Sequence, residues 1–302
     1  MGGARGRAAL AAVLALLALA AAGPATSFQR GMLAGRPYRV WVPTRPALDR
    51  PLVVALHGCW QTPEDFAFGT RLNEAAERRG LVVVYPAQSH RDNPYRCWNW
   101  FDPTQQTATG TETGQILAIA RHVQAERGVR ESRLAVLGFS AGAWMAVNLA
   151  CAAPEAVMGL GTTAGGPYRC AGGPEAAIQC MRGSKPDGGR AAAAACAGGR
   201  LPGVRASLWH GTLDSVVGPE NLTALEAMLG RLLAVSGGAT ASEEGGAVHA
   251  VYRDARGVPV LETWLVPGMG HAWSGGDPRA THTWPRGPSA TERMLDFLLA
   301  GR

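Results

Sequence analysis

The sequence lacks the patterns that mark several common classes of binding protein. Its six cysteines form no Cys-x-x-Cys pair, and no histidine cluster has the spacing of zinc ligands, so we expect no structural metal site. Lysine and arginine are scattered, with no basic run longer than two, although the formal net charge is +6. A nucleic-acid partner would require a concentrated basic stripe, and we expect none. Beyond residue 22, no apolar segment is long enough to cross a bilayer.

The first residues have the pattern of a secretory signal peptide. Arg5 and Arg7 precede an unbroken apolar run from Ala8 to Ala22, and small residues follow. The run is shorter than the ~20 residues that a spanning helix needs, which favours a cleaved signal over an uncleaved membrane anchor. We expect a signal peptide over residues 1–22, with cleavage after Ala22 or after Ala25. The mature protein is then secreted, extracellular or periplasmic, with no stable membrane insertion.

Apolar runs and amphipathic stretches alternate along the rest of the chain. The runs predict strands at 38–42, 52–57, 81–86, 133–138, 157–163, 204–210 and 260–266. The amphipathic stretches predict helices at 63–79, 112–127, 140–152, 219–235 and 289–299. This alternation indicates an α/β fold, with a mostly parallel sheet covered by helices on both faces and antiparallel pairing at one edge, near Tyr38. We expect one catalytic domain over residues 28–302 and a monomer.

One segment interrupts the alternation. Residues 165–203 are rich in glycine and alanine and contain three of the six cysteines. Such an insertion is either a flexible surface loop or a partial cover over the active site, tied down by a disulfide. An even number of cysteines in an exported chain favours disulfides over metal ligands.

The most informative motif is Gly138-Phe139-Ser140-Ala141-Gly142. It joins a predicted buried strand to a predicted helix, and a serine on such a sharp turn exposes its hydroxyl above the sheet. A serine hydroxyl needs a base and an orienting acid to become a nucleophile, and an α/β-hydrolase supplies them in the order Ser, Asp or Glu, then His. The motif therefore predicts that Ser140 is a nucleophile in an α/β-hydrolase fold.

Position along the chain selects the base and the acid. His271 follows the final predicted strand in a glycine-rich loop, whereas His57 and His210 end earlier strands and are better placed to support loops. Asp214 follows the strand before that of His271, which suits a carboxylate that orients the imidazole; Asp277 is the alternative.

Donors for an oxyanion are expected from two backbone segments. One is the N–H of Ala141, the residue after the nucleophile, and the other lies in the loop 57–61. This chemistry implies no metal and no organic cofactor.

Five motifs in this order resemble the secreted esterases of the polyhydroxybutyrate (PHB) depolymerase family, which are similar to feruloyl and acetylxylan esterases. They are Leu56-His-Gly-Cys-Trp-Gln61, Cys97-Trp-Asn-Trp-Phe101, Gly138-Phe-Ser-Ala-Gly142, His210-Gly-Thr-Leu-Asp214 and Gly268-Met-Gly-His-Ala-Trp-Ser-Gly-Gly276. The resemblance covers residues 38–299. By position, it implies that Ser140 is the nucleophile, Asp214 the acid, His271 the base and the Cys59 N–H the second oxyanion donor.

The resemblance also implies a bridge between Cys59 and Cys97, which would fasten the oxyanion loop. The remaining four cysteines, Cys151, Cys170, Cys180 and Cys196, allow three pairings, and Cys151 on a helix is alternatively a buried thiol.

Four tryptophans lie in the motif loops and are candidates for an apolar acyl or sugar surface: Trp60, Trp98, Trp100 and Trp273. The alternative is that their indoles simply pack the core or the loops.

The expected activity is that of a secreted serine esterase acting on short 3-hydroxyalkanoate ester bonds. Family members that attack solid polyester carry a linker and a polymer-binding domain, which do not follow the last helix here. We therefore expect amorphous polymer, oligoesters or small esters as substrates. The alternatives are a feruloyl or acetylxylan esterase, with the same triad, and a catalytically silent secreted binding protein.

Overall fold

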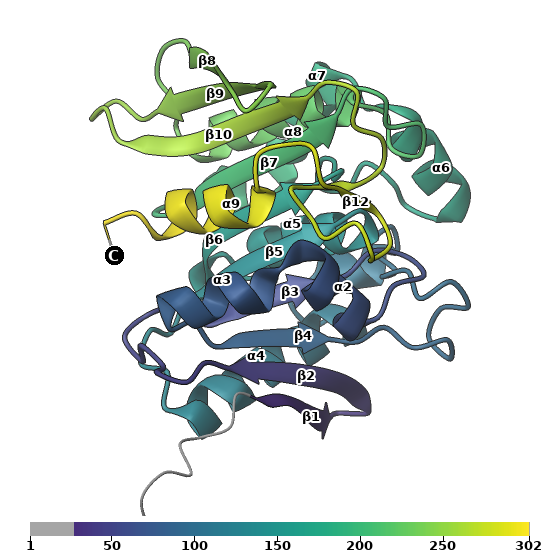
Figure 1. Cartoon of the computed structure of the whole chain (residues 1–302). Coiled ribbons are helices and arrows are strands. Elements are labelled where there is room, and N and C mark those ends of the chain that lie inside the picture. Colours follow the sequence, from purple (N-terminus) through teal and green to yellow (C-terminus); the bar gives the residue numbers. More distant parts are fainter. Residues whose placement is uncertain (1–26, 302) are drawn as a thin grey trace, which may run out of the picture.

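A ten-stranded sheet runs through the computed structural model, which describes residues 27–301 (Figure 1). The predicted signal peptide lies outside the described residues. The strand order is β1-β2-β4-β3-β5-β6-β7-β10-β9-β8. The bounds are β1 Ser27–Leu33, β2 Arg36–Val42, β3 Val53–Leu56, β4 Val83–Pro86, β5 Leu134–Phe139, β6 Val157–Thr163, β7 Arg205–Gly211, β8 Thr240–Glu244, β9 Ala247–Arg253 and β10 Pro259–Val266. A separate parallel pair joins β11 (Trp273–Ser274) to β12 (Thr283–Trp284).

The middle of the sheet is parallel, as the buried apolar runs predict. Strands β4, β3, β5, β6, β7 and β10 run in one direction, and every residue of β3, β4, β5 and β6 is buried. Antiparallel pairing occurs at both edges, whereas the sequence predicted it at one. The β8–β9 hairpin was not predicted, because β8 is polar and mostly exposed and therefore carries no apolar run.

Helices cover both faces of the sheet, with α3 and α9 in front of it in Figure 1 and α4 and α5 behind. Their bounds are α2 Pro63–Thr70, α3 Leu72–Arg79, α4 Thr111–Arg127, α5 Ala141–Ala152, α6 Pro174–Arg182, α7 Pro186–Ala195, α8 Glu220–Leu232 and α9 Ala290–Leu299, with short 3₁₀ turns at η1 Pro103–Gln106, η2 Pro154–Ala156 and η3 Ala197–Gly199. The single helix predicted over 63–79 is two helices, because Arg71 adopts a φ of +56° between α2 and α3.

The insertion at 165–203 contains ordered structure. It carries α6 and α7, and α7 packs against α8. Two disulfides hold it: Cys170 to Cys180 within the insertion, and Cys151 on α5 to Cys196 after α7. Cys151 is therefore half of a bridge and not a free thiol.

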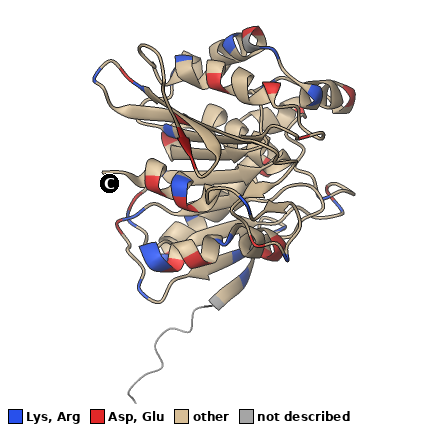
Figure 2. Cartoon of the chain, turned by 45° about the horizontal axis from the view of Figure 1, so that its top comes forward, with Lys and Arg blue, Asp and Glu red and all other residues tan. Residues whose placement is uncertain are grey.

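The positions of basic and acidic residues are dispersed along the helices and loops of the ribbon (Figure 2). Among residues 27–301, no helix has the length and apolar character needed to cross a bilayer.

Candidate active site

Ser140 stands on a sharp turn between β5 and α5. Its φ of 53° and ψ of −121° are unusual for a residue with a side chain, and such backbone conformations concentrate at functional sites. A Cβ on Gly138 would lie 2.2 Å from the Gly142 carbonyl oxygen, and one on Gly142 would lie 2.1 Å from the Leu56 carbonyl oxygen. The Ser140 N–H donates to the Thr163 carbonyl oxygen at 3.0 Å. Both glycines are thus required sterically for the turn that presents this hydroxyl.

The structure brings Ser140, His271 and Asp214 together from the ends of three strands. The Nε2 atom of His271, in the loop after β10, lies 3.0 Å from Ser140 Oγ, and its Nδ1 lies 2.8 Å from Oδ2 of Asp214, in the loop after β7. The alternative acid, Asp277, instead binds Arg279 through both carboxylate oxygens, at 2.9 and 2.8 Å. The arrangement can move a proton from the Ser140 hydroxyl to the His271 imidazole.

The surroundings of Asp214 keep it ionised and fixed. Its Oδ1 accepts the N–H groups of Val216 and Val217 at 2.9 and 2.8 Å, and its side chain is fully buried. Burial favours the neutral carboxyl, but the hydrogen bond and charge of His271 prevail and lower the pKa of Asp214 below its usual value. His210 Nε2 donates to the Val217 carbonyl at 2.9 Å, so this histidine supports the acid loop, as its position predicted.

The loop after β3 carries Cys59, which lines the same cleft as Ser140. A disulfide joins Cys59 to Cys97, the pair that the resemblance implied, and the Trp60 N–H donates to the Tyr95 carbonyl at 2.7 Å. Within residues 27–301, neither the Cys59 N–H nor the Ala141 N–H donates to another protein group. Cys59 lines the same cleft as Ser140, and Ala141 is the residue that follows Ser140.

His57 holds this loop in place through three hydrogen bonds. Its Nδ1 donates to the Gly58 carbonyl at 2.8 Å, its Nε2 accepts the Gln88 N–H at 3.1 Å, and its own carbonyl accepts the Trp98 indole N–H at 3.1 Å. Burial lowers the pKa of His57 to about 4, which keeps the ring neutral and Nε2 able to accept. His57 therefore has a structural position and lies outside the hydrogen-bonded series of Ser140, His271 and Asp214.

A buried polar network holds the segment that carries Cys97, the second cysteine of the Cys59–Cys97 disulfide. Glu112 accepts the backbone and side-chain N–H groups of Asn99 at 2.9 and 2.7 Å, and also bonds Gln88. Gln88 in turn donates to the Cys97 carbonyl at 3.1 Å, and Arg36 bonds Gln88 at 2.7 Å. Arg36 and Glu112 are only 2% and 3% exposed. The segment that carries Cys97 is thereby tied to β2 and α4.

These elements enclose a cleft of about 460 Å³ above Ser140, with mostly apolar walls. Met181 of α6 forms part of one wall, so the insertion borders the site. Trp60 is 63% exposed and its ring packs against Tyr95, with centroids 5.1 Å apart. The lining residues are Cys59, Trp60, Tyr95, Cys97, Phe139, Ser140, Met181, Val216, His271 and His282.

Of the four tryptophans predicted as candidates for a substrate surface, Trp60 lines the cleft, whereas Trp98, Trp100 and Trp273 do not. Trp98 is fully buried beneath the loop, Trp100 stacks on Trp144 with centroids 4.4 Å apart, and the Trp273 indole donates to Thr291 Oγ1 at 3.0 Å. Their rings point into the core because each finds a packing or hydrogen-bonding partner there. These three side chains are assigned to packing.

Sequence reasoning missed four side chains of the cleft. They are Tyr95, Met181, Val216 and His282. None stands in a motif with chemical content. The φ of +51° at His282, which turns it towards the cleft, has no signature in the sequence.

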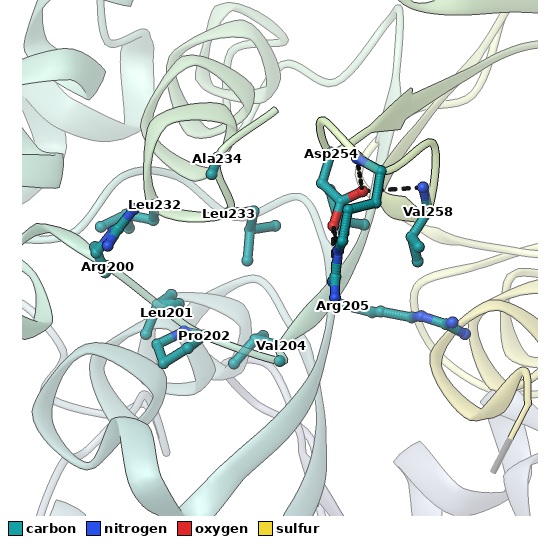
Figure 3. A pocket seen from close by; sticks show the side chains of 13 residues that line it. Arg200, Leu201, Pro202, Val204, Arg205, Leu232, Leu233, Ala234, Asp254 and Val258 are labelled. Atoms are coloured by element: carbon teal, nitrogen blue, oxygen red, sulfur yellow. Dashed lines mark hydrogen bonds and ion pairs between the residues drawn. The ribbon is translucent and has the colours of Figure 1, made fainter. Parts of the chain in front are cut away.

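A second hollow, of about 440 Å³, lies at the amino ends of the parallel strands, where β7 and β10 begin (Figure 3). The Ser140 cleft lies at the opposite, carboxyl ends of the strands. Asp254 accepts the Val258 N–H there at 3.0 Å and pairs with Arg256, while the Arg205 side chain points away towards α9. Ligands of open α/β sheets bind at the carboxyl ends of the strands, which favours the cleft above Ser140 as the site. Within the described chain, no group of three or more His, Cys, Asp or Glu side chains is placed to hold a metal ion.

Comparison with known proteins assigns the family. Residues 36–251 match the family model described as esterase PHB depolymerase. The chain belongs to the PHB depolymerase esterase family. Poly(3-hydroxyalkanoate) depolymerase C of Paucimonas lemoignei is 33% identical to this chain over 235 residues. The match covers 76% of this chain and 56% of the relative. Feruloyl esterase B of Neurospora crassa is 30% identical over 200 residues, covering 62% and 66%.

The fold of this chain also resembles the folds of solved structures. An acetyl xylan esterase from Aspergillus awamori superposes with a TM-score of 0.68 at 18% identity, over 81% of this chain and 94% of that one. This likeness confirms the α/β-hydrolase fold. Against the two relatives named above, the chain spans between a half and two thirds of their length.

Proposed function

We propose that the protein is a serine esterase that hydrolyses short-chain 3-hydroxyalkanoate esters. The observation that carries the proposal is the hydrogen-bonded series Ser140–His271–Asp214 at the base of an apolar cleft. Membership of a family whose relatives are named depolymerases of hydroxyalkanoate polyesters supports the substrate class. An apolar cleft with few charged groups suits a neutral ester.

In the proposed mechanism, His271 Nε2 takes the proton of the Ser140 hydroxyl while Oγ attacks the ester carbonyl carbon. The N–H groups of Cys59 and Ala141 bind the oxyanion that forms. Asp214 holds the imidazole in the tautomer that receives the proton and stabilises the imidazolium. His271 then protonates the leaving alcohol, and a water molecule activated by the same imidazole releases the acid from the acyl-enzyme.

Export is part of the proposal. The apolar N-terminal run predicts a signal peptide, and three disulfides support folding in an oxidising compartment. Amorphous polymer, oligoesters or small esters are the proposed substrates. A feruloyl or acetylxylan esterase is the second candidate, because a feruloyl esterase is 30% identical to the chain.

The test compares the purified mature protein with Ser140→Ala and with Ser132→Ala, an exposed serine that precedes β5. The substrates are p-nitrophenyl butyrate, 3-hydroxybutyrate oligomers, amorphous polymer film and methyl ferulate. We expect hydrolysis of the oligomers, a fall in kcat of about 10⁶-fold in Ser140→Ala and wild-type activity in Ser132→Ala. Inactivity of the wild type on every ester contradicts the enzyme function. A strong preference for ferulate contradicts the depolymerase assignment.

A further inference from the structure

Hydrogen-bonded side chains join the oxyanion loop, residues 57–61, to the segment that carries His271. Gln61 is the last residue of that loop and is 4% exposed. Its Oε1 accepts the Gly58 N–H, within the loop, at 2.9 Å, and its Nε2 donates to Thr281 Oγ1 at 3.2 Å. Gln61 and Thr281 are 220 residues apart in the sequence. One buried amide therefore contacts both segments at once.

Asp65, in the first turn of α2, binds the same two side chains. Its Oδ2 accepts the Gln61 amide N–H at 3.1 Å and also the Thr281 hydroxyl, and its Oδ1 accepts the Thr281 N–H at 3.3 Å. Hydrogen bonds to a carboxylate are stronger than those between neutral groups. Gln61, Asp65 and Thr281 are called the Gln61 cluster below.

The residue after Thr281 extends these contacts to the base. The His282 carbonyl accepts the Trp273 N–H at 2.8 Å, beside the parallel pair of β11 and β12. The His282 imidazole forms a hydrogen bond with the His271 backbone, and the two rings have centroids 5.8 Å apart. A shift of Thr281 relative to the oxyanion loop would therefore be passed to His271.

We propose that the Gln61 cluster positions the oxyanion donor and the base relative to each other. In the proposed mechanism, the Cys59 N–H binds the oxyanion while His271 transfers a proton. Such groups must be held within about 0.5 Å of their productive positions. No member of the Gln61 cluster is among the described residues that line the cleft, so its three side chains act through other residues. This inference rests on the proposed function and adds positioning residues to it.

The test removes one hydroxyl group and keeps the shape of the side chain. Thr281→Val loses the side-chain bonds to Gln61 and Asp65, whereas Thr281→Ser keeps the hydroxyl. Thr281 is exposed, so we expect both variants to fold. Thr283→Val is the matched control, because the Thr283 hydroxyl donates to the Asp277 carbonyl of its own segment at 2.8 Å. For each protein, kcat and KM on p-nitrophenyl butyrate are measured well below its Tm.

We expect kcat to fall about tenfold in Thr281→Val, the range of one hydrogen bond to a charged group, with KM within about twofold of the wild type. In Thr281→Ser and in Thr283→Val, kcat should stay within about threefold of the wild type. A role in stability alone would lower Tm and leave kcat unchanged in Thr281→Val, and this result overturns the proposal. A fall of equal size in Thr283→Val overturns it as well.

A double-mutant cycle tests whether the cluster acts as one unit. It compares Gln61→Leu and Thr281→Val with the double variant. Because both changes break the same connection, the double variant should lose no more kcat than the more damaged single variant. Losses that multiply mean that the two side chains act separately, and they overturn the proposal. The Thr281 variants decide alone if Gln61→Leu does not fold.

The failure of this inference is distinguishable from that of the proposed function. An active wild type with an unchanged kcat in Thr281→Val overturns the positioning role alone. Inactivity of the wild type on p-nitrophenyl butyrate and on 3-hydroxybutyrate oligomers overturns the positioning role together with the proposed function.

Discussion

Removing the Cys59–Cys97 bridge should damage catalysis more than its contribution to stability explains. The bridge closes a loop with a sequence separation of 38 residues and carries the proposed oxyanion donor. The Cys151–Cys196 bridge closes a loop of similar size, with a separation of 45 residues, between the end of α5 and the segment after α7. Each pair is replaced by alanines, in the variants Cys59→Ala/Cys97→Ala and Cys151→Ala/Cys196→Ala.

The two variants should lose similar stability. In the chain-entropy model, a loop of either size contributes about 4 kcal/mol by restricting the unfolded chain. For a chain of this length, that corresponds to a fall in Tm of about 7 °C, which calorimetry under non-reducing conditions measures. The kcat values should differ between the two variants. Loss of one oxyanion donor costs about 3 kcal/mol of transition-state stabilisation, so kcat on p-nitrophenyl butyrate should fall about 100-fold without the Cys59–Cys97 bridge.

The Cys151–Cys196 variant, assayed well below its own Tm, should keep a kcat within about threefold of the wild type, because no residue of that bridge lines the cleft. Equal kcat values in the two variants would refute the reasoning. They would mean that the hydrogen bonds around His57 and Glu112 position the oxyanion loop without the disulfide.

Three further predictions follow from the site. Trp60→Ala should raise KM for apolar esters several-fold without changing Tm, because its ring is exposed in the cleft. Trp98→Ala should lower the free energy of unfolding by about 3–5 kcal/mol in urea titrations, because its ring is buried. Equal changes in KM and in stability for the two variants would contradict their assigned positions. Asp214→Asn should lower kcat about 10⁴-fold in steady-state kinetics with the fold intact by circular dichroism, because Asn favours the wrong imidazole tautomer. The buried His57 has a pKa of about 4, below its unfolded value, so the unfolded state binds the extra proton between these values. Stability should therefore fall by about 3 kcal/mol as pH drops from 6.5 to 4, and His57→Asn should flatten this dependence in urea titrations.

The central sheet and the turn that carries Ser140 could be predicted because their signals are local. Continuous apolar runs exist only where a strand is buried on both faces, and these runs located the parallel strands, including β5 before Ser140. Glycines at 138 and 142 are required by backbone contacts across the turn, so the motif records a steric constraint directly.

The remaining features depend on contacts that are distant in the sequence. Nothing near Arg71 or His282 announces a positive φ, which is maintained by neighbouring segments. A motif loop places a tryptophan near the site but not the direction of its ring, and Trp100 turns inward because Trp144 on α5 offers it a stacking partner. Strand β8 is exposed and polar, so no periodicity distinguishes it from a loop.

That same strand has a consequence for the molecule in concentrated solution. Among residues 27–301, β8 is the last strand in the sheet order, so one row of its backbone N–H and carbonyl groups has no neighbouring strand there, at the upper edge in Figure 1. An unpaired edge invites a strand of another molecule to add to the sheet, and natural proteins discourage this with short strands and charged side chains. The strand has only five residues and ends in Glu243 and Glu244. The short length of β8 and the charge of Glu243 both discourage such pairing, while the Glu244 carboxylate pairs with Arg293 of α9.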